Sequence, residues 1–168
     1  THSIIGSGIP KWFDTFSDKK EFISSLKILS HFSDSIHLTL INTNKGHSLP
    51  TADPERYLHV LTAQFDSTQT LIQKDTIRIG QTWKWNPAEK LGDNRLAADE
   101  SRGFTFSLNP KSTHVTIKAW HVRLNPEFVP FMKTTKWHTM FGFSDTLMTT
   151  MERHYPLARL LYHETTHL

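Results

Sequence analysis

Apolar residues alternate with polar ones through the middle of the chain, and this two-residue period constrains the fold more than any other feature. Side chains two residues apart lie on the same face of a β-strand, so an alternating segment has one apolar and one polar face. Alternation is clear at 36–41, 104–108 and 115–119, and we expect further strands at 57–65 and between 70 and 85. Five or more such strands joined by turn-rich loops predict a mainly β protein built as an antiparallel β-sandwich.

The N-terminal part of the chain has a different period. Asp18 and Glu21 have the spacing of a helix capping box, and apolar residues then recur at helical intervals as far as Leu29. This pattern predicts a short helix over 19–29, or at least one helical turn that leads into a strand.

The C-terminal part loses strict alternation after Pro126, where it becomes rich in aromatic residues and methionine. Ser144 has the character of a helix N-cap, and Pro156 interrupts a helical pattern that continues to the end of the chain. We therefore expect an extended, partly helical C-terminal tail. Its apolar character favours a docking arm whose surface is covered by a partner.

These patterns divide the chain into three parts. They are an irregular segment with a short helix at 1–34, a β-sandwich domain at 35–125, and an apolar, partly helical arm at 126–168. The chain starts at Thr1 and shows no signal-peptide pattern, which favours a mature form or a fragment.

Composition excludes several classes of function. The chain has no cysteine, which excludes disulfides, thiolate zinc sites, iron–sulfur ligation and covalent c-type haem attachment within it. Its net charge is +3 and its basic residues are scattered, so we expect no nucleic-acid partner. No apolar run is long enough to span a bilayer. The 11 histidines raise the question of a metal or haem site.

The sequence ends in LLYHETTHL, which matches the H-E-x-x-H pattern of zinc peptidases. On a helix, His163 and His167 would share one face and hold zinc, with Glu164 as general base. A catalytic zinc needs a third protein ligand, commonly supplied downstream, and Thr165 and Thr166 are poor helix formers. A zinc-dependent hydrolase is therefore a secondary hypothesis. We expect no zinc, although His163 and His167 remain the candidate metal-ligating residues.

The stretch GHSLPTADPERY, which follows the first clear strand, is more informative. Pro50 and Pro54 restrict φ and Gly46 can adopt a positive φ, so we expect a long, rigid loop. We expect its charged residues to form ion pairs, within the loop or with charged residues at 90–95. His47 is expected to be accessible and able to reach a metal or a haem iron.

Two stretches, NKGHSLPTADPERYL and IGQTWKWNPAEKLGDNRLAADESRGFTFSL, resemble the β-rich C-terminal region of a family of multihaem c-type cytochromes. In that family a segment with C-x-x-C-H haem-attachment motifs precedes a β-domain. The β-domain has an N-x-G-A-G-H-x-x-P-T-G-like loop and a D-x-R-L-x-P-x-E-like segment. The matching residues are Asn44, Gly46, His47, Pro50 and Thr51 for the loop, and Asp93, Arg95, Leu96 and Glu100 for the segment.

The chain departs from that family most strongly in having no C-x-x-C-H motif. Ala52 and Ala98 also stand where glycine and proline are usual. The resemblance covers residues 36–125 and implies a non-catalytic electron-transfer component, with haem c held by another chain or a missing segment. It implies that His47 and His2, which precedes a glycine-containing stretch, approach or ligate that haem iron.

The resemblance also implies a haem-bearing cytochrome polypeptide as partner, or a homo-oligomer formed through the apolar arm, in the periplasm or outside the cell. Tryptophans could pack against a porphyrin or belong to the core or an interface; they are Trp83, Trp85, Trp120 and Trp137. A third hypothesis is a structural or binding module without redox chemistry.

Overall fold

The alternating segments form the strands of two antiparallel sheets. A computed structural model describes residues 26–51, 54, 56–122, 134–140, 142–147, 149 and 158–168. The elements within these residues are β1 (Leu26–Phe32), β2 (Ser35–Asn42), β3 (Tyr57–Phe65), β4 (Leu71–Trp85), β5 (Ala88–Asp93), β6 (Ser101–Ser107), β7 (His114–Val122), the short helix α2 (Trp137–Met140) and β8 (Ala158–His167).

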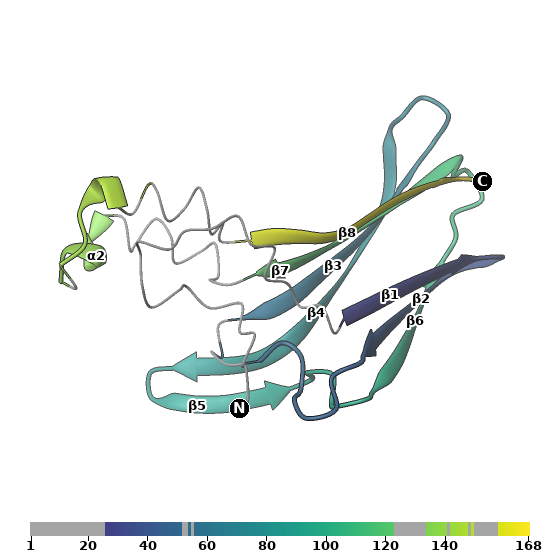
Figure 1. Ribbon diagram of the computed structural model, residues 1–168. Helices are drawn as coiled ribbons and strands as arrows, with labels where there is room; N and C mark the ends of the chain where they lie inside the picture. Colours follow the sequence, from purple (N-terminus) through teal and green to yellow (C-terminus); the bar gives the residue numbers. More distant parts are fainter. Residues whose placement is uncertain are drawn as a thin grey trace.

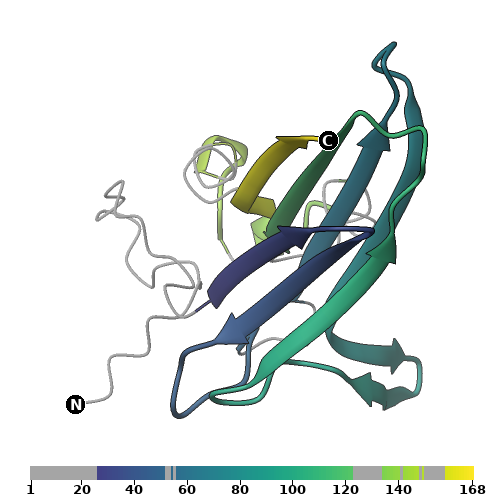
Figure 2. The same ribbon diagram turned by 90° about the vertical axis from the view of Figure 1, so that its right-hand side faces the viewer.

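The strands are arranged in two layers (Figures 1 and 2). One sheet has the order β1-β2-β6 and the other has the order β5-β4-β3-β7-β8. Every pairing within them is antiparallel. The predicted mainly β, sandwich-like fold is therefore confirmed.

The core lies between the two sheets and consists of the inward residues of the alternating strands. Inward side chains of the central strands are buried because the opposite sheet excludes water from them, and those of the edge strands are partly buried. This burial stabilises the fold by about 25 cal/mol per Å² of apolar surface. The buried cluster comprises Ile36, Leu38, Leu40, Leu49, Leu58, Val60, Ile79, Leu96, Val115, Ile117 and Ala119.

A helix that extends over 26–29 is wrong, whereas the alternative of a helical turn leading into a strand agrees with the strand found there. Residues 26–29 belong to strand β1, while 19–25 lie outside the described residues. Leu26 and Ile28 pack against the core, whereas Leu29 is 55% exposed. Partly buried and exposed side chains therefore alternate every two residues in this segment, as in a strand. Pairing with β2 overrides the local helical pattern of the sequence.

The expected helix at the C-terminal end is also wrong. Residues 158–167 form strand β8, which pairs with β7 along its length. The β-branched Thr165 and Thr166 suit a strand better than a helix, and the free edge of β7 supplies backbone partners. The capping role of Ser144 is confirmed, because its Oγ accepts a hydrogen bond of 3.1 Å from the backbone N–H of Leu147.

The three-part division at 34/35 and 125/126 stays a prediction. Strand β1 comes from the first predicted part and β8 from the last, and each forms an edge of a sheet. Within the described residues, no helix is long and apolar enough to cross a membrane.

Candidate functional site

The two segments that carry the cytochrome-like motifs lie against each other in the structure. Residues 43–51 leave β2 for the other sheet, and residues 94–100 return from β5 to β6; we call them the crossover loops. Leu49 and Leu96 exchange two backbone hydrogen bonds, of 2.8 and 2.9 Å, and both side chains are buried. The two motifs, about 50 residues apart in sequence, therefore form one structural unit.

Asn42, at the end of β2, fixes this unit from inside. Its fully buried side chain donates to the carbonyls of His47, Leu96 and Ala97 at 2.8, 3.2 and 2.8 Å. Its Oδ1 accepts a 3.0 Å hydrogen bond from the N–H of Asn44. A buried amide that satisfies carbonyls on both loops costs little to bury and makes their separation unfavourable. Sequence reasoning missed Asn42, although a polar residue at an inward strand position was a usable signal.

The charged residues of the second motif pair where β5 ends and the second crossover loop begins. Nε and Nη2 of Arg95 donate to the two carboxylate oxygens of Asp93 at 2.8 and 2.7 Å. Lys90 also contacts this carboxylate, at 2.7 Å. The hydrogen bonds from Arg95 are the main reason that the pKa of Asp93 lies well below its usual range. These residues therefore pair with one another. The expected ion pairs of the first loop stay a prediction, because Asp53 and Glu55 lie outside the described residues.

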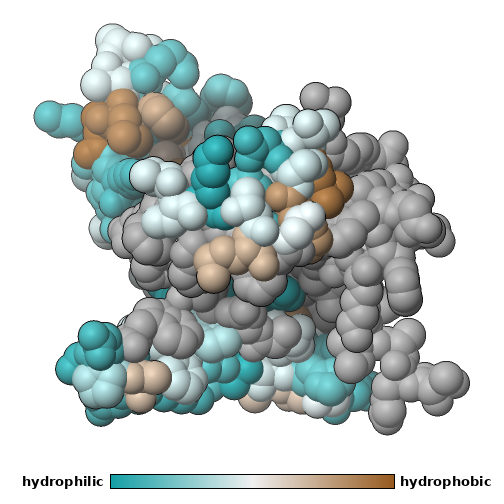
Figure 3. All heavy atoms as spheres, turned by 90° about the vertical axis from the view of Figure 1, so that its left-hand side faces the viewer, coloured by the Kyte–Doolittle hydropathy of each residue, from teal (hydrophilic) through white to brown (hydrophobic). Residues whose placement is uncertain are grey.

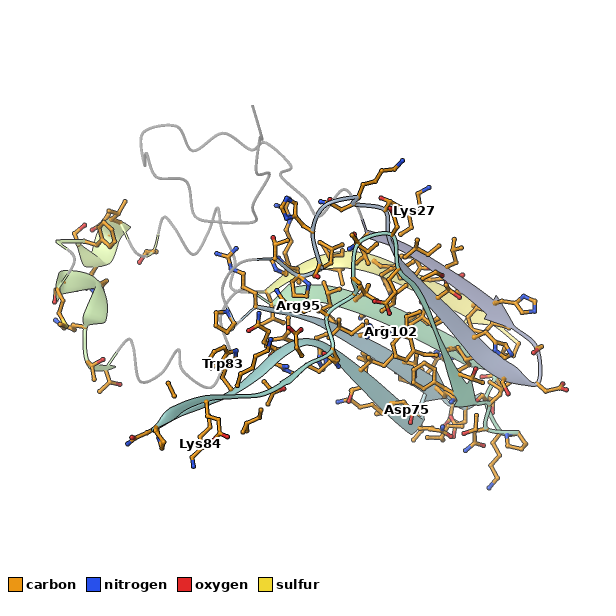
Figure 4. All side chains as sticks on the ribbon, turned by 90° about the horizontal axis from the view of Figure 1, so that it is seen from below. Lys27, Asp75, Trp83, Lys84, Arg95 and Arg102 are labelled. Atoms are coloured by element: carbon orange, nitrogen blue, oxygen red, sulfur yellow. The ribbon has the colours of Figure 1, made fainter. Side chains whose placement is uncertain are left out.

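Glu100 and Arg102 complete the second crossover loop. The Glu100 carboxylate accepts from the Ala97 N–H at 2.6 Å and from Arg102 Nε at 2.7 Å. Arg102 also donates to the carbonyls of Asn94 and Arg95, at 2.6 and 3.2 Å, and Figure 4 shows Arg95 and Arg102 close together. The Glu100 pKa is lowered, first by the Ala97 N–H and then by Arg102. These motif charges therefore build the loop.

His47 lies at the exposed side of the first crossover loop. Its carbonyl is held by Asn42, while Asn44 Oδ1 accepts from the Gly46 N–H at 2.9 Å and the Asn44 carbonyl accepts from the Asp99 N–H at 3.1 Å. The backbone on both sides of His47 is thus anchored and its imidazole is accessible. The other haem-approaching candidate, His2, lies outside the described residues.

The H-E-x-x-H match lies on strand β8, so its residues do not have the helical arrangement that a zinc site of this type requires. His163 and His167 both point outward and are four positions apart along the strand, a distance of about 13 Å. Glu164 points to the opposite face, where Tyr162 Oη donates to it at 2.5 Å and Ser30 Oγ also donates to it. In the described part of the chain, no group of three or more metal-ligating side chains gathers. His163 and His167 as metal ligands stay a prediction.

The tryptophans are spread over the molecule. Trp83 is half-buried on β4 and donates to Gln81 at 2.7 Å, and it lies at the base of the β4–β5 hairpin (Figure 4). Trp120 packs on the outer face of the larger sheet, with 5.8 Å between its ring and that of His59. Burial, and secondarily Lys74, lowers the pKa of His59. The side chains of Trp85 and Trp137 lie outside the described residues.

The β4–β5 hairpin projects from the rest of the larger sheet, and its surface is mainly hydrophilic (Figure 3, bottom). Among its described side chains, the large apolar one that is exposed is Leu91, at 59%.

The fold and the crossover loops define a mainly β, sandwich-like module. Among solved structures, this fold is similar to that of a penta-haem cytochrome c552 from Thermochromatium tepidum, with a TM-score of 0.64 and 13% sequence identity. The similarity covers 96% of this chain and 42% of that chain, so this chain spans less than half of that cytochrome's length. At this identity the likeness shows a shared fold. No protein-family model matches the sequence, and neither does any curated protein.

Proposed function

We propose that this chain is a non-catalytic module of a multihaem cytochrome c electron-transfer assembly. The proposed partner is the haem-bearing polypeptide, either another chain or a segment not included here. This implies a periplasmic or extracellular location. Because the chain has no cysteine, the haem c in this proposal is attached to the partner and not to these residues.

The observation that carries the proposal is the geometry around His47. The side-chain amide of Asn42 donates to the His47 carbonyl and also to carbonyls of the second crossover loop, so it holds the His47 backbone in place. The imidazole of His47 stays exposed. A ligand that must meet an iron from another polypeptide needs a fixed backbone and an accessible ring nitrogen. The fold shared with a penta-haem cytochrome supports the same proposal. Residues of this chain would orient a bound haem, and the haem would carry the electron.

An absorption spectrum of the native assembly, together with a mass for every chain present, tests this function. We expect a Soret band contributed by the haem-bearing partner. In His47→Ala the bands that report iron ligation should shift, because an axial nitrogen is lost. His31→Ala is the control, since His31 is exposed on the smaller sheet. A native assembly without haem would refute the function, whereas an unchanged His47→Ala spectrum would remove only His47 from the haem site.

A further inference from the structure

His114 and His167, two histidines on neighbouring strands of the larger sheet, have a geometry suited to a metal ion. His114 opens β7 and His167 ends β8, and the strand register places them directly opposite each other. Their ring centroids are 5.7 Å apart. Two imidazoles that share a metal at about 2.0–2.1 Å per nitrogen have centroids ~5–6 Å apart. Figure 1 shows the C-terminal end of β8 beside the start of β7.

One member of the pair is held in place by packing. The His114 ring stacks on Phe65 of β3 at a centroid distance of 4.7 Å and an angle of 3°, and His114 is only 7% exposed. Backbone hydrogen bonds fix the ladder on both sides, from Thr113 N–H to the Phe65 carbonyl at 2.8 Å and from Leu168 N–H to the Thr113 carbonyl at 2.9 Å. A ligand whose rotamer is set by packing loses little conformational entropy when it binds a metal.

The ring nitrogens of this pair are available. Neither imidazole has a hydrogen-bond partner among the residues that the structure describes, and His167 is exposed. Neither His114 nitrogen is among the fully buried, unpaired side-chain atoms. A neutral imidazole nitrogen is a good ligand for the later first-row divalent metals, so two such nitrogens on adjacent strands can chelate one ion.

The other close histidine pair has a less suitable geometry. His31 and His37 face each other across β1 and β2 with centroids 6.1 Å apart and ring planes at 26°. A bound metal lies close to the plane of each imidazole that ligates it, so two rings stacked face to face, as these are, do not converge on one ion. The rings of His114 and His167 are tilted by 42° and are not stacked on each other. His37 Nδ1 is also within 3.3 Å of Thr105 Oγ1.

We infer that His114 and His167 form a two-imidazole site for a divalent transition metal of the nickel, copper and zinc group. Water completes the coordination shell, because no third ligand gathers at the pair within the described residues. The site uses His167 of the H-E-x-x-H match, but its second ligand comes from β7 and Glu164 takes no part. This inference does not depend on the proposed electron-transfer function.

The test is titration of the full chain with Cu²⁺, followed by calorimetry and by the nitrogen couplings in the electron paramagnetic resonance spectrum. We expect two equatorial imidazole nitrogens in the wild type and about tenfold or greater weakening in His167→Ala. His114→Phe, which keeps the ring stack on Phe65, should weaken binding similarly. His163→Ala is the matched control, because His163 is exposed on the same face of β8 opposite Lys118.

The inference fails if His167→Ala and the wild type bind Cu²⁺ equally. It also fails if His163→Ala weakens binding as much as His167→Ala does. If His37→Ala, and not His167→Ala, removes the two-nitrogen signal, the metal binds at the β1–β2 pair and the assignment is wrong. Circular dichroism of each variant checks that the fold is retained.

Discussion

At the scale of single residues, the side-chain amide of Asn42 stabilises the crossover loops more than the charged motif residues do. The ion pairs Asp93–Arg95 and Glu100–Arg102 lie at the surface and are partly exposed, where an ion pair contributes about 0–1 kcal/mol. Asn42 instead bonds carbonyls from both loops in a water-free environment. A buried donor that is removed leaves those acceptors unsatisfied, which costs more than the bond itself contributes.

Substituting Asn42→Ala should lower the free energy of unfolding by about 2–3 kcal/mol. Urea denaturation measures the loss, and hydrogen exchange should show faster exchange at the amides of Leu49 and Leu96. Asn109→Ala is the control, because Asn109 Oδ1 accepts one exposed hydrogen bond from Lys111. If the two variants lose the same stability, Asn42 does not hold the crossover loops together.

At the scale of elements, strand β4 changes partner at a glycine. Gly80 pairs with Tyr57 of β3, and the next residue, Gln81, pairs with Asp93 of β5. Asn94 bridges this junction: its Oδ1 accepts from the Gly80 N–H at 2.7 Å and its Nδ2 donates to the Arg78 carbonyl at 2.8 Å. The strand can therefore leave the main sheet without unsatisfied backbone groups.

A side chain at position 80 should disturb this junction. A Cβ on Gly80 would lie 2.8 Å from Tyr57 Cβ and 3.0 Å from the Arg56 carbonyl oxygen, so β3 and β4 would have to separate locally. We expect Gly80→Ala to cost about 1–3 kcal/mol in urea denaturation. Gly92→Ala and Gly103→Ala are matched controls, because no atom lies within 4 Å of a Cβ at either position. Equal stability of all three variants would contradict this account.

At the scale of the whole molecule, the edge strands β1 and β8 of the two sheets are joined by polar side chains. The Glu164 carboxylate accepts from Tyr162 Oη and from Ser30 Oγ, and so links the sheets where the apolar core ends. Burial raises the pKa of Tyr162, and its hydrogen bond to Glu164 raises that pKa further. The folded state therefore favours the protonated phenol more than the unfolded state does.

This linkage predicts a dependence of stability on alkaline pH. The folded pKa of Tyr162 exceeds the unfolded value of about 10, so its contribution is complete below pH ~10 and is lost as the pH rises through the raised pKa. The free energy of unfolding should fall more steeply above pH ~10 in the wild type than in Tyr162→Phe. Tyr57→Phe serves as control, and the absorbance of ionised tyrosine locates the transition. Identical slopes for the wild type and Tyr162→Phe would contradict the linkage.

The sequence alone determined the strands whose alternation is strict, because a two-residue apolar period places all the apolar side chains on one face only in a β-strand. It predicted β2 and β3 closely, and β4, β6 and β7 in outline. It also pointed to both crossover motifs and to the accessible His47 loop. The local sequence pattern predicted a strand correctly where the residues that favour an extended backbone are also placed to bury one face.

Tertiary structure decided the features that depend on a distant partner. Leu26 and Leu29 fit a helix as well as a strand until β2 supplies backbone partners, and the HETTH stretch becomes a strand because β7 has a free edge. The same pairing places His167 beside His114, 53 residues earlier in the chain, and Leu49 beside Leu96. Such contacts arise from strand register and sheet order, which a one-dimensional period does not encode.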